Sequence, residues 1–239
     1  MDYFGYTGEA PDLAGYAGTV IRDVTHSLFS RTYDDADYTF GSLRKWCGVY
    51  TGGFARARDG HPLERGGEDA SGYTALRAKA MEEKVRYLAG EGDKSYLEIF
   101  AEAEDLLEEA GISPATERDI ALAKTLDVSF IRQRRRENAE LLREAFPDRL
   151  LFPDMKETDC PLFVPVRVPE GQRDALRRYL IEREIYCPVH WPVSGYHRLT
   201  EKEQSFYDEE LSLVCDQRYG REDMERIIET VRSFWEERG

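Results

Sequence analysis

Three short strand-like runs in the first sixty residues constrain the fold more than any other feature of the chain. Residues 19–21 are apolar or β-branched and lead to Asp23, and residues 38–40 form a second run that ends at Gly41. A third segment turns at the glycine pair 52–53. Runs of β-branched and aromatic residues that are closed by glycine are typical of strands. We therefore expect strands whose ends bring several side chains, Asp23 among them, together.

Helical periodicity dominates residues 70–125. Apolar residues recur at i, i+3 and i+4 in two segments, and each segment ends at a glycine. The pair Ser113-Pro114 predicts the start of a further helix, and residues 127–146 predict another. The last of these carries a basic run, Arg132 to Arg136, that is typical of a solvated helix face. The two periodic segments are residues 73–90 and 95–111.

After Pro153 the pattern changes to alternating strands and helices, which indicates a small α/β unit. We expect a boundary near residue 127, between a first domain of residues 1–127 and a second domain of residues 128–239. The expected elements are a strand in 160–169, a helix in 171–184, an extended segment in 185–193, a strand and turn in 211–220 and a helix in 221–237.

Charge and cysteine content disfavour several classes of function. Lys and Arg number 33 against 47 Asp and Glu, and the net charge of −14 repels nucleic acid and anionic membranes. The four cysteines lie far apart, without a CxxC pair or a Cys/His group at metal-ligand spacing, so we expect reduced thiols and no metal site. No signal peptide opens the chain, and no apolar run approaches the roughly 20 residues that span a bilayer. We therefore expect a cytoplasmic protein with neither a nucleic acid nor a membrane as its partner.

The polar residues at the expected strand ends have the spacing of a site for pyridoxal 5′-phosphate. Ser42 lies three residues before Lys45, and Asp23 lies 22 residues before Lys45 on a neighbouring strand. A lysine amine can form a Schiff base with the cofactor aldehyde. A carboxylate can keep the pyridine nitrogen protonated, so that the ring takes up carbanion charge. These residues therefore favour a pyridoxal phosphate enzyme.

Three motifs carry a resemblance to a known family. The motifs "DVTH" at 23–26, "SLRK" at 42–45 and "TGG" at 51–53 resemble the Asp-x-x-Gln, Ser-x-x-Lys and Gly-Gly motifs of the DegT/DnrJ/EryC1 group of fold-type I aminotransferases. Segments 185–193 and 211–220 resemble the small domain of that family. The resemblance implies an α/β fold of the aspartate aminotransferase-like, pyridoxal phosphate-dependent transferase type.

The resemblance assigns roles to four residues. It implies that Lys45 forms the Schiff base, that Asp23 pairs with the pyridine nitrogen and that Ser42 contacts the phosphate. His26 would pack near the ring and its phenolic oxygen, at a position where the family more often has Gln. Simpler alternatives stay open: Asp23 and Ser42 could cap turns, and His26 could be a hydrogen-bonded core residue. Arg44 competes with Ser42 as a phosphate partner.

The chain departs from the family at its beginning. In the family, a long stretch before the segment "YFGY" holds the phosphate and supplies the aromatic residue that stacks on the ring, whereas this sequence begins at "MDYFGY". We therefore expect an incomplete large domain followed by a whole small domain. A split gene, a misplaced start, a shortened chain or a remnant would each account for this. The expected partner is then a second copy in a homodimer, or a complementing chain that supplies the N-terminal half.

Two segments of the second domain offer residues for substrate binding. His190 and Trp191 lie in "PVHWP", where the prolines fix an extended backbone that presents both side chains. Packing of Trp191 against the large domain is the alternative. Arg218 could hold a substrate carboxylate through two parallel hydrogen bonds. A surface salt bridge with Asp216 or Asp223 is the alternative for that arginine.

The implied reaction is a transamination between an amino acid donor and a keto sugar or keto acid. The donor displaces Lys45 from the cofactor, and the freed amine carries a proton between the substrate α-carbon and the cofactor C4′ carbon. Two other functions stay open. One is a catalytically weak or inactive homologue that serves as a binding or assembly module. The other is a different pyridoxal phosphate reaction, such as a dehydration or a lyase step.

Overall fold

A computed structural model of the chain describes residues 3–8, 12–30, 36–64, 67, 71–109, 112–169, 171–190 and 193–238. Two units emerge from its internal contacts. The sheet unit contains residues 15–25 and 33–126, and the C-terminal unit contains residues 1–14, 26–32 and 127–239. Residues 1–14 and 26–32 thus group with the end of the chain, although the sequence places them in the first domain. The division into domains of residues 1–127 and 128–239 stays a prediction.

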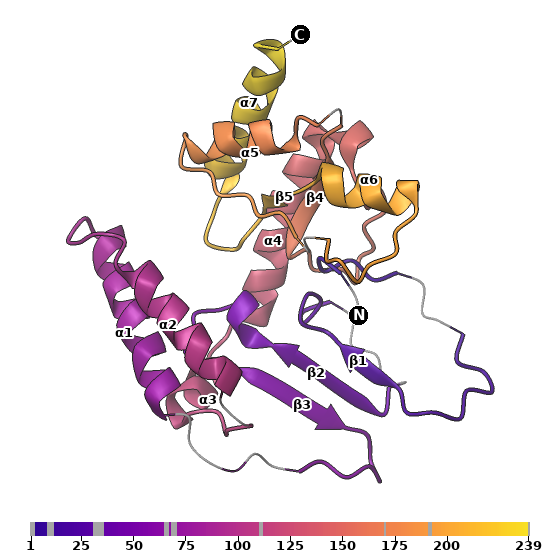
Figure 1. The fold of residues 1–239 in the computed structure, drawn as a ribbon, viewed down its shortest axis with the longest axis vertical. Helices are drawn as coiled ribbons and strands as arrows, with labels where there is room; N and C mark the ends of the chain where they lie inside the picture. Colours follow the sequence, from indigo (N-terminus) through magenta and orange to yellow (C-terminus); the bar gives the residue numbers. More distant parts are fainter. Residues whose placement is uncertain are drawn as a thin grey trace. The chain divides into compact units, whose positions relative to one another are not determined.

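The sheet unit is built on three short strands. β1 (Ile21–Asp23) pairs in parallel with β2 (Tyr38–Ser42), and β2 pairs antiparallel with β3 (Gly53–Ala57), in the order β1-β2-β3 (Figure 1). The prediction that β2 ends at Gly41 is wrong, because that glycine leaves room for an aromatic ring of β3. A Cβ at position 41 would lie 2.9 Å from the Phe54 ring. The strand therefore continues to Ser42 and passes directly into a 3-10 turn, η1 (Leu43–Lys45).

The sheet unit also contains helices. α1 (Ser71–Leu88) and α2 (Tyr96–Glu109) pack against each other, and Figure 1 shows them side by side. α3 (Glu117–Lys124) begins later than Ser113-Pro114 predicts. The reason is an N-cap at Thr116, whose side chain accepts a hydrogen bond from the Asp119 N–H.

The C-terminal unit combines a two-stranded sheet with helices. β4 (Phe163–Arg167) pairs antiparallel with β5 (Glu210–Val214). α4 (Val128–Ala145) and α5 (Arg173–Ile181) pack against these strands and against α7 (Arg221–Glu236). A further 3-10 turn, η2 (Pro147–Arg149), follows α4. The core consists of apolar side chains that these elements bury together, among them Leu142, Val164, Leu176, Leu211, Leu213 and Phe234.

One helix of the C-terminal unit is not predicted by periodicity. α6 (Glu201–Glu209) begins at a capping box in which the Thr200 and Glu203 side chains each accept from the backbone N–H of the other residue. This Thr-x-x-Glu pattern is readable in the sequence. Within the described part of the chain, none of the helices is long and apolar enough to cross a membrane.

The interpretation of residues 132–136 as a solvated helix face is wrong. Arg135 is only 1% exposed, and its guanidinium donates to the Gln217 side chain at 2.6 Å and to the Leu162 carbonyl at 3.0 Å. Arg132 donates to the carbonyl of Phe29. Arg136 donates to three backbone carbonyls of the loop before β4, at 2.8, 3.3 and 2.9 Å. These arginines therefore connect α4 to distant segments of its own unit.

The cysteines are free thiols, and three of them are buried. Burial raises the pKa of Cys160 to about 11 and that of Cys187 to about 12. Thiols with such pKa values are protonated at neutral pH and react slowly. Cys187 and Cys215 pack in the core of the C-terminal unit.

Candidate functional site

Three predicted site residues lie at or just after the carboxyl ends of the parallel strands β1 and β2. Asp23 ends β1, Ser42 ends β2, and Lys45 follows in η1. In the strand register Asp23 lies beside Phe40, and the Val24 N–H donates to the Phe40 carbonyl at 2.9 Å. Because parallel strands end at the same edge of a sheet, the three residues belong to one edge, as the sequence spacing predicts. Their roles toward a cofactor stay predictions.

Trp46 connects the two chain segments of this edge. Its side chain is 1% exposed, and its Nε1–H donates to the Thr25 carbonyl at 2.8 Å. The Thr25 N–H donates in turn to Asp23 Oδ1 at 2.8 Å, which fixes that carboxyl against its own loop. Lys45 is exposed, and among the described residues none forms a hydrogen bond or ion pair with its amine. The edge thus presents a fixed carboxyl and an accessible amine.

A buried carboxylate, Asp119, holds the turn that follows η1. It is 3% exposed and accepts hydrogen bonds from the N–H groups of Tyr50 and Thr51, at 2.9 and 2.8 Å. It also accepts from the hydroxyls of Thr51 and Thr116. Burial acts to raise the pKa of Asp119, but these hydrogen bonds outweigh burial and hold the pKa below its ordinary value. The sequence gives no specific signal for this role, because an acid in a first helical turn is an ordinary capping residue.

Gly52 is required by the conformation of that turn. Its φ of 144° is rarely adopted by other residues, and a Cβ there would lie 2.8 Å from the Val49 side chain. The Gly52 carbonyl accepts a hydrogen bond from the Leu43 N–H at 2.8 Å. The turn therefore lies against the segment that carries Lys45, and its position depends on Asp119.

A cavity of about 830 Å³ lies beside this turn within the sheet unit. Its lining includes Ser42, Arg44 and the backbone of the two glycines of the turn. The Arg44 guanidinium donates to the Tyr73 hydroxyl at 2.9 Å and pairs with Glu104 at 2.6 Å. Arg44 already has these partners, which makes it the weaker candidate for a phosphate contact. The phosphate contact of Ser42 stays a prediction.

His26 and His190 lie together in the C-terminal unit. Their ring centroids are 5.6 Å apart, and the Phe4 ring lies 5.8 Å from His26 and 5.1 Å from His190. His26 is 3% exposed. The backbone N–H of His190 donates to Glu210 at 2.9 Å, and its Nδ1 lies 3.0 Å from the Ser212 hydroxyl. The structure thus places His26 in a buried aromatic cluster, and its contact with a cofactor ring stays a prediction.

Arg218 is held by a neighbouring acid. Its Nε and Nη2 donate to the two carboxyl oxygens of Asp216 at 2.9 and 3.0 Å, in the geometry that a substrate carboxylate would require. Burial acts to raise the pKa of Asp216, but the hydrogen bond from Arg218 lowers it below its ordinary value. A substrate carboxylate would therefore have to displace Asp216. The other proposed contact of this region, Trp191, lies outside the described residues.

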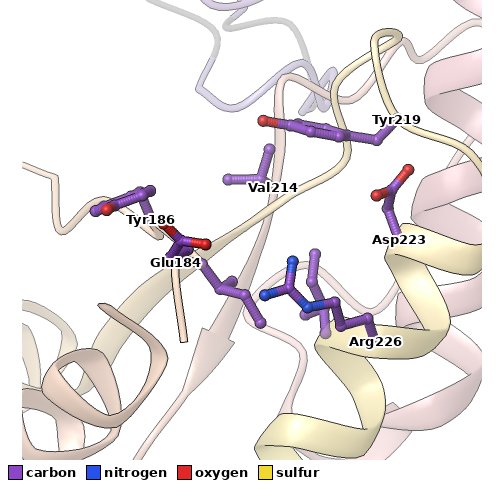
Figure 2. A pocket seen from close by; sticks show the side chains of 8 residues that line it. Glu184, Tyr186, Val214, Tyr219, Asp223 and Arg226 are labelled. Atoms are coloured by element: carbon purple, nitrogen blue, oxygen red, sulfur yellow. The ribbon is translucent and has the colours of Figure 1, made fainter. Parts of the chain in front are cut away.

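The C-terminal unit also has a small pocket of about 90 Å³ (Figure 2). The rings of Tyr186 and Tyr219 border it, and Glu184, Asp223 and Arg226 line it as well. Arg226 donates to a backbone carbonyl, and Asp223 accepts from a backbone N–H at 2.9 Å. These two charged groups are therefore used within the fold.

Comparisons with solved structures agree on one fold. The putative sugar aminotransferase Spr1654 from Streptococcus pneumoniae, in its PLP form, is 18% identical with a TM-score of 0.60; the match covers 97% of this chain and 62% of that one. The aminotransferase TlmJ from Streptoalloteichus hindustanus is 19% identical with a TM-score of 0.57, and the match covers 97% of this chain and 63% of TlmJ. A DegT DnrJ EryC1 StrS aminotransferase from Brucella abortus is 14% identical with a TM-score of 0.54, and the match covers 90% of this chain and 56% of that one. No family model matches the chain, and no curated protein matches it.

The chain spans between 56% and 63% of the length of these three solved chains. At identities below 20% the likeness concerns the fold. The predicted α/β, aminotransferase-like fold is confirmed. Over that part of their length, this chain has the fold of the DegT/DnrJ/EryC1/StrS aminotransferases.

Proposed function

We propose that this chain forms part of a pyridoxal 5′-phosphate-dependent aminotransferase, which transfers an amino group from an amino acid to a keto sugar or a keto acid. One observation carries the proposal. The carboxyl ends of a parallel strand pair carry Asp23, Ser42 and Lys45, and the chain shares its fold with solved aminotransferases. Ligands of open α/β sheets bind outside that edge.

The residues of this edge fit the cofactor chemically. Lys45 offers an exposed amine, Asp23 a fixed carboxyl and Ser42 a hydroxyl beside the 830 Å³ cavity. Gly52 and Gly53 line the same cavity without side chains, which would let a phosphate approach the backbone closely. When bound, the cofactor supplies an electron sink for carbanion charge at the substrate α-carbon.

The proposal gives each residue a defined task, and it gives Lys45 two. Lys45 Nζ binds the cofactor aldehyde and later moves the proton of the substrate α-carbon. The Asp23 carboxyl would keep the proton on the pyridine nitrogen, and the His26 ring would pack beside the cofactor ring. The residues proposed for substrate contact are His190, Trp191 and Arg218.

The partial coverage favours a second candidate function. Because the match reaches only 56–63% of the three solved chains, residues without a counterpart here can contribute to their cofactor sites. The chain could then be a binding or assembly module with weak or no activity. A partner in a homodimer, or a complementing chain, could instead supply the missing groups. A dehydration or a lyase step would use the same lysine and acid.

Covalent trapping tests the proposal. The purified chain is incubated with pyridoxal phosphate and reduced with borohydride, and the modified peptide is identified by mass spectrometry. We expect the adduct on Lys45, its loss in Lys45→Ala, and its retention in Lys124→Ala, which removes an exposed lysine of the same unit. An adduct that persists in Lys45→Ala contradicts the assignment. An adduct without transamination of keto sugars or keto acids favours the binding module, and no adduct in the wild type contradicts cofactor binding by this chain alone.

A further inference from the structure

The C-terminal unit has a cavity of about 300 Å³ whose walls are almost entirely apolar. Small-molecule sites have volumes from about 300 Å³ upward and combine apolar walls with a few fixed polar groups. The volume suits a ligand of ring size. The apolar lining consists of Phe4, Leu151, Phe152, Phe206 and Tyr207, and the polar lining consists of His190 and Glu210.

Glu210 is the unusual member of this lining, because it is a buried acid. It is 7% exposed and is the first residue of β5. One carboxyl oxygen accepts from the Ser212 hydroxyl, and the other accepts from the His190 N–H at 2.9 Å. Among the described residues, no lysine or arginine pairs with this carboxyl, and the His190 ring nitrogen lies 3.7 Å from it. The neutral donors thus fix its orientation without supplying a full positive charge.

The imidazole belongs to the same hydrogen-bonded chain. The Ser212 hydroxyl has one proton, which it donates to Glu210, and Ser212 is fully buried. The hydroxyl oxygen therefore accepts from His190 Nδ1, which lies 3.0 Å away. The contact fixes the His190 ring, which packs against Phe163 at 4.9 Å between centroids. The cavity thus has a preorganised polar end.

The ligand chemistry follows from this combination of groups. A carboxyl in apolar surroundings is costly unless a cation or further donors meet it. Aromatic walls also attract an ammonium group through their ring faces. An acidic ligand would be repelled by Glu210. We propose that this cavity binds a primary amine with an apolar, ring-sized body, whose ammonium group meets Glu210 while the ring contacts the apolar walls.

This proposal goes beyond the proposed function, because the binding needs neither a cofactor nor turnover. All residues of the cavity belong to the C-terminal unit. That the bound amine is also a substrate would rest on the proposed function, in which His190 contacts the substrate. Failure of Lys45 to take the cofactor would leave amine binding intact, and failure of amine binding would leave the cofactor adduct intact.

Calorimetric titration of the full chain without cofactor tests the proposal with three matched probes. They are 2-phenylethylamine, 2-phenylethanol and phenylacetate, which share a ring and differ in charge. We expect the amine to bind about tenfold more tightly than the alcohol, since hydrogen bonds to a charged group are the stronger ones, and the acid not to bind. Equal affinities of amine and alcohol, preferential binding of the acid, or no binding of the amine at millimolar concentration would each overturn the proposal.

Matched variants locate the site. Glu210→Gln keeps the side-chain shape, and we expect it to weaken the amine about tenfold and to leave the alcohol unchanged. Glu184→Gln removes the same charge from the small pocket in Figure 2 and should change neither affinity. Equal losses in both variants would indicate an effect of net charge and overturn the assignment. If circular dichroism shows that Glu210→Gln does not fold, Phe206→Ala tests the site instead. We expect Phe206→Ala to lower the affinities for the amine and the alcohol alike, and unchanged affinities would refute the site.

Discussion

Replacing Asp119 by alanine tests whether one buried carboxylate holds the turn beside Lys45. Two of its hydrogen bonds come from the backbone N–H groups of Tyr50 and Thr51, which cannot rotate toward other acceptors. A buried donor that loses its acceptor costs about 1–3 kcal/mol, so the buried Tyr50 amide predicts a loss of about 1–3 kcal/mol in the free energy of unfolding, and the half-buried Thr51 amide adds less. The hydroxyls of Thr51 and Thr116 can rotate, and they add little to this figure.

Urea unfolding measures the size of the effect, and amide hydrogen exchange shows its location. In Asp119→Ala the amides of Tyr50 and Thr51 should exchange faster, together with the predicted loss of stability. Glu117→Ala removes an exposed acid from the same turn of α3 and should change stability by less than about 0.5 kcal/mol. If the Asp119→Ala protein matched the stability of the wild type and kept both amides protected, the turn would not depend on this carboxylate.

The same carboxylate gives stability a pH dependence in acid. Because the pKa of Asp119 is lowered in the folded state, the unfolded chain binds this proton first as the pH falls. Its contribution is therefore complete above the unfolded pKa of about 3.9 and disappears as the pH falls through the folded pKa. The free energy of unfolding of Asp119→Asn should therefore lie closest to that of the wild type at the lowest pH. A stability difference that stays constant from neutral pH to strong acid would contradict this.

Three further substitutions have defined outcomes. Asp23→Asn should keep the borohydride-fixed adduct on Lys45 but slow transamination roughly a hundredfold in single-turnover kinetics, and unchanged turnover would remove Asp23 from the site. Gly52→Ala should lower the free energy of unfolding in urea by about 1 kcal/mol or more, because its φ of 144° strains any other residue; an unchanged midpoint would contradict that turn geometry. Arg135→Ala should cost about 2–6 kcal/mol in the same assay, since the carbonyls of Pro161 and Leu162 lose a buried donor at about 1–3 kcal/mol each, whereas Arg134→Ala at a more exposed position should cost little. Equal costs for the two arginines would refute the buried role.

The strands and long helices were predictable because their signals are local. The run of residues 38–40 lies in β2, the run of residues 19–21 reaches β1 only at Ile21, and the periodic segments 73–90 and 95–111 correspond to α1 and α2. α6 was missed because its apolar periodicity is weak, although the Thr200 capping box marked its first turn. Strong local propensity thus predicts these elements, whereas α6 is marked in the sequence only by its cap.

The buried charged residues were not predictable, because their partners lie far away in the sequence. Arg135 meets Gln217 at a separation of 82 residues, and Asp119 meets Tyr50 at a separation of 69 residues. A basic run on a helix and an acid in a first turn are usually solvated. Which of them becomes buried depends on the backbone groups that another segment brings to the same place, and those groups have no sequence signature of their own.

The same reasoning explains why only part of the candidate site could be predicted. Asp23, Ser42 and Lys45 follow strand ends, and the pairing of parallel strands brings such residues to one edge whatever the remaining packing is. Glu210, in contrast, is the third member of an acidic run at 208–210, a pattern that indicates a solvated surface. β5 begins at that residue, and alternation along the strand puts Glu210 and Ser212 on the same side of the sheet. Because β5 begins at Glu210, this acid is buried at the cavity beside His190. A shift of the strand by one residue would turn the carboxyl to the other side of the sheet and abolish the proposed amine site.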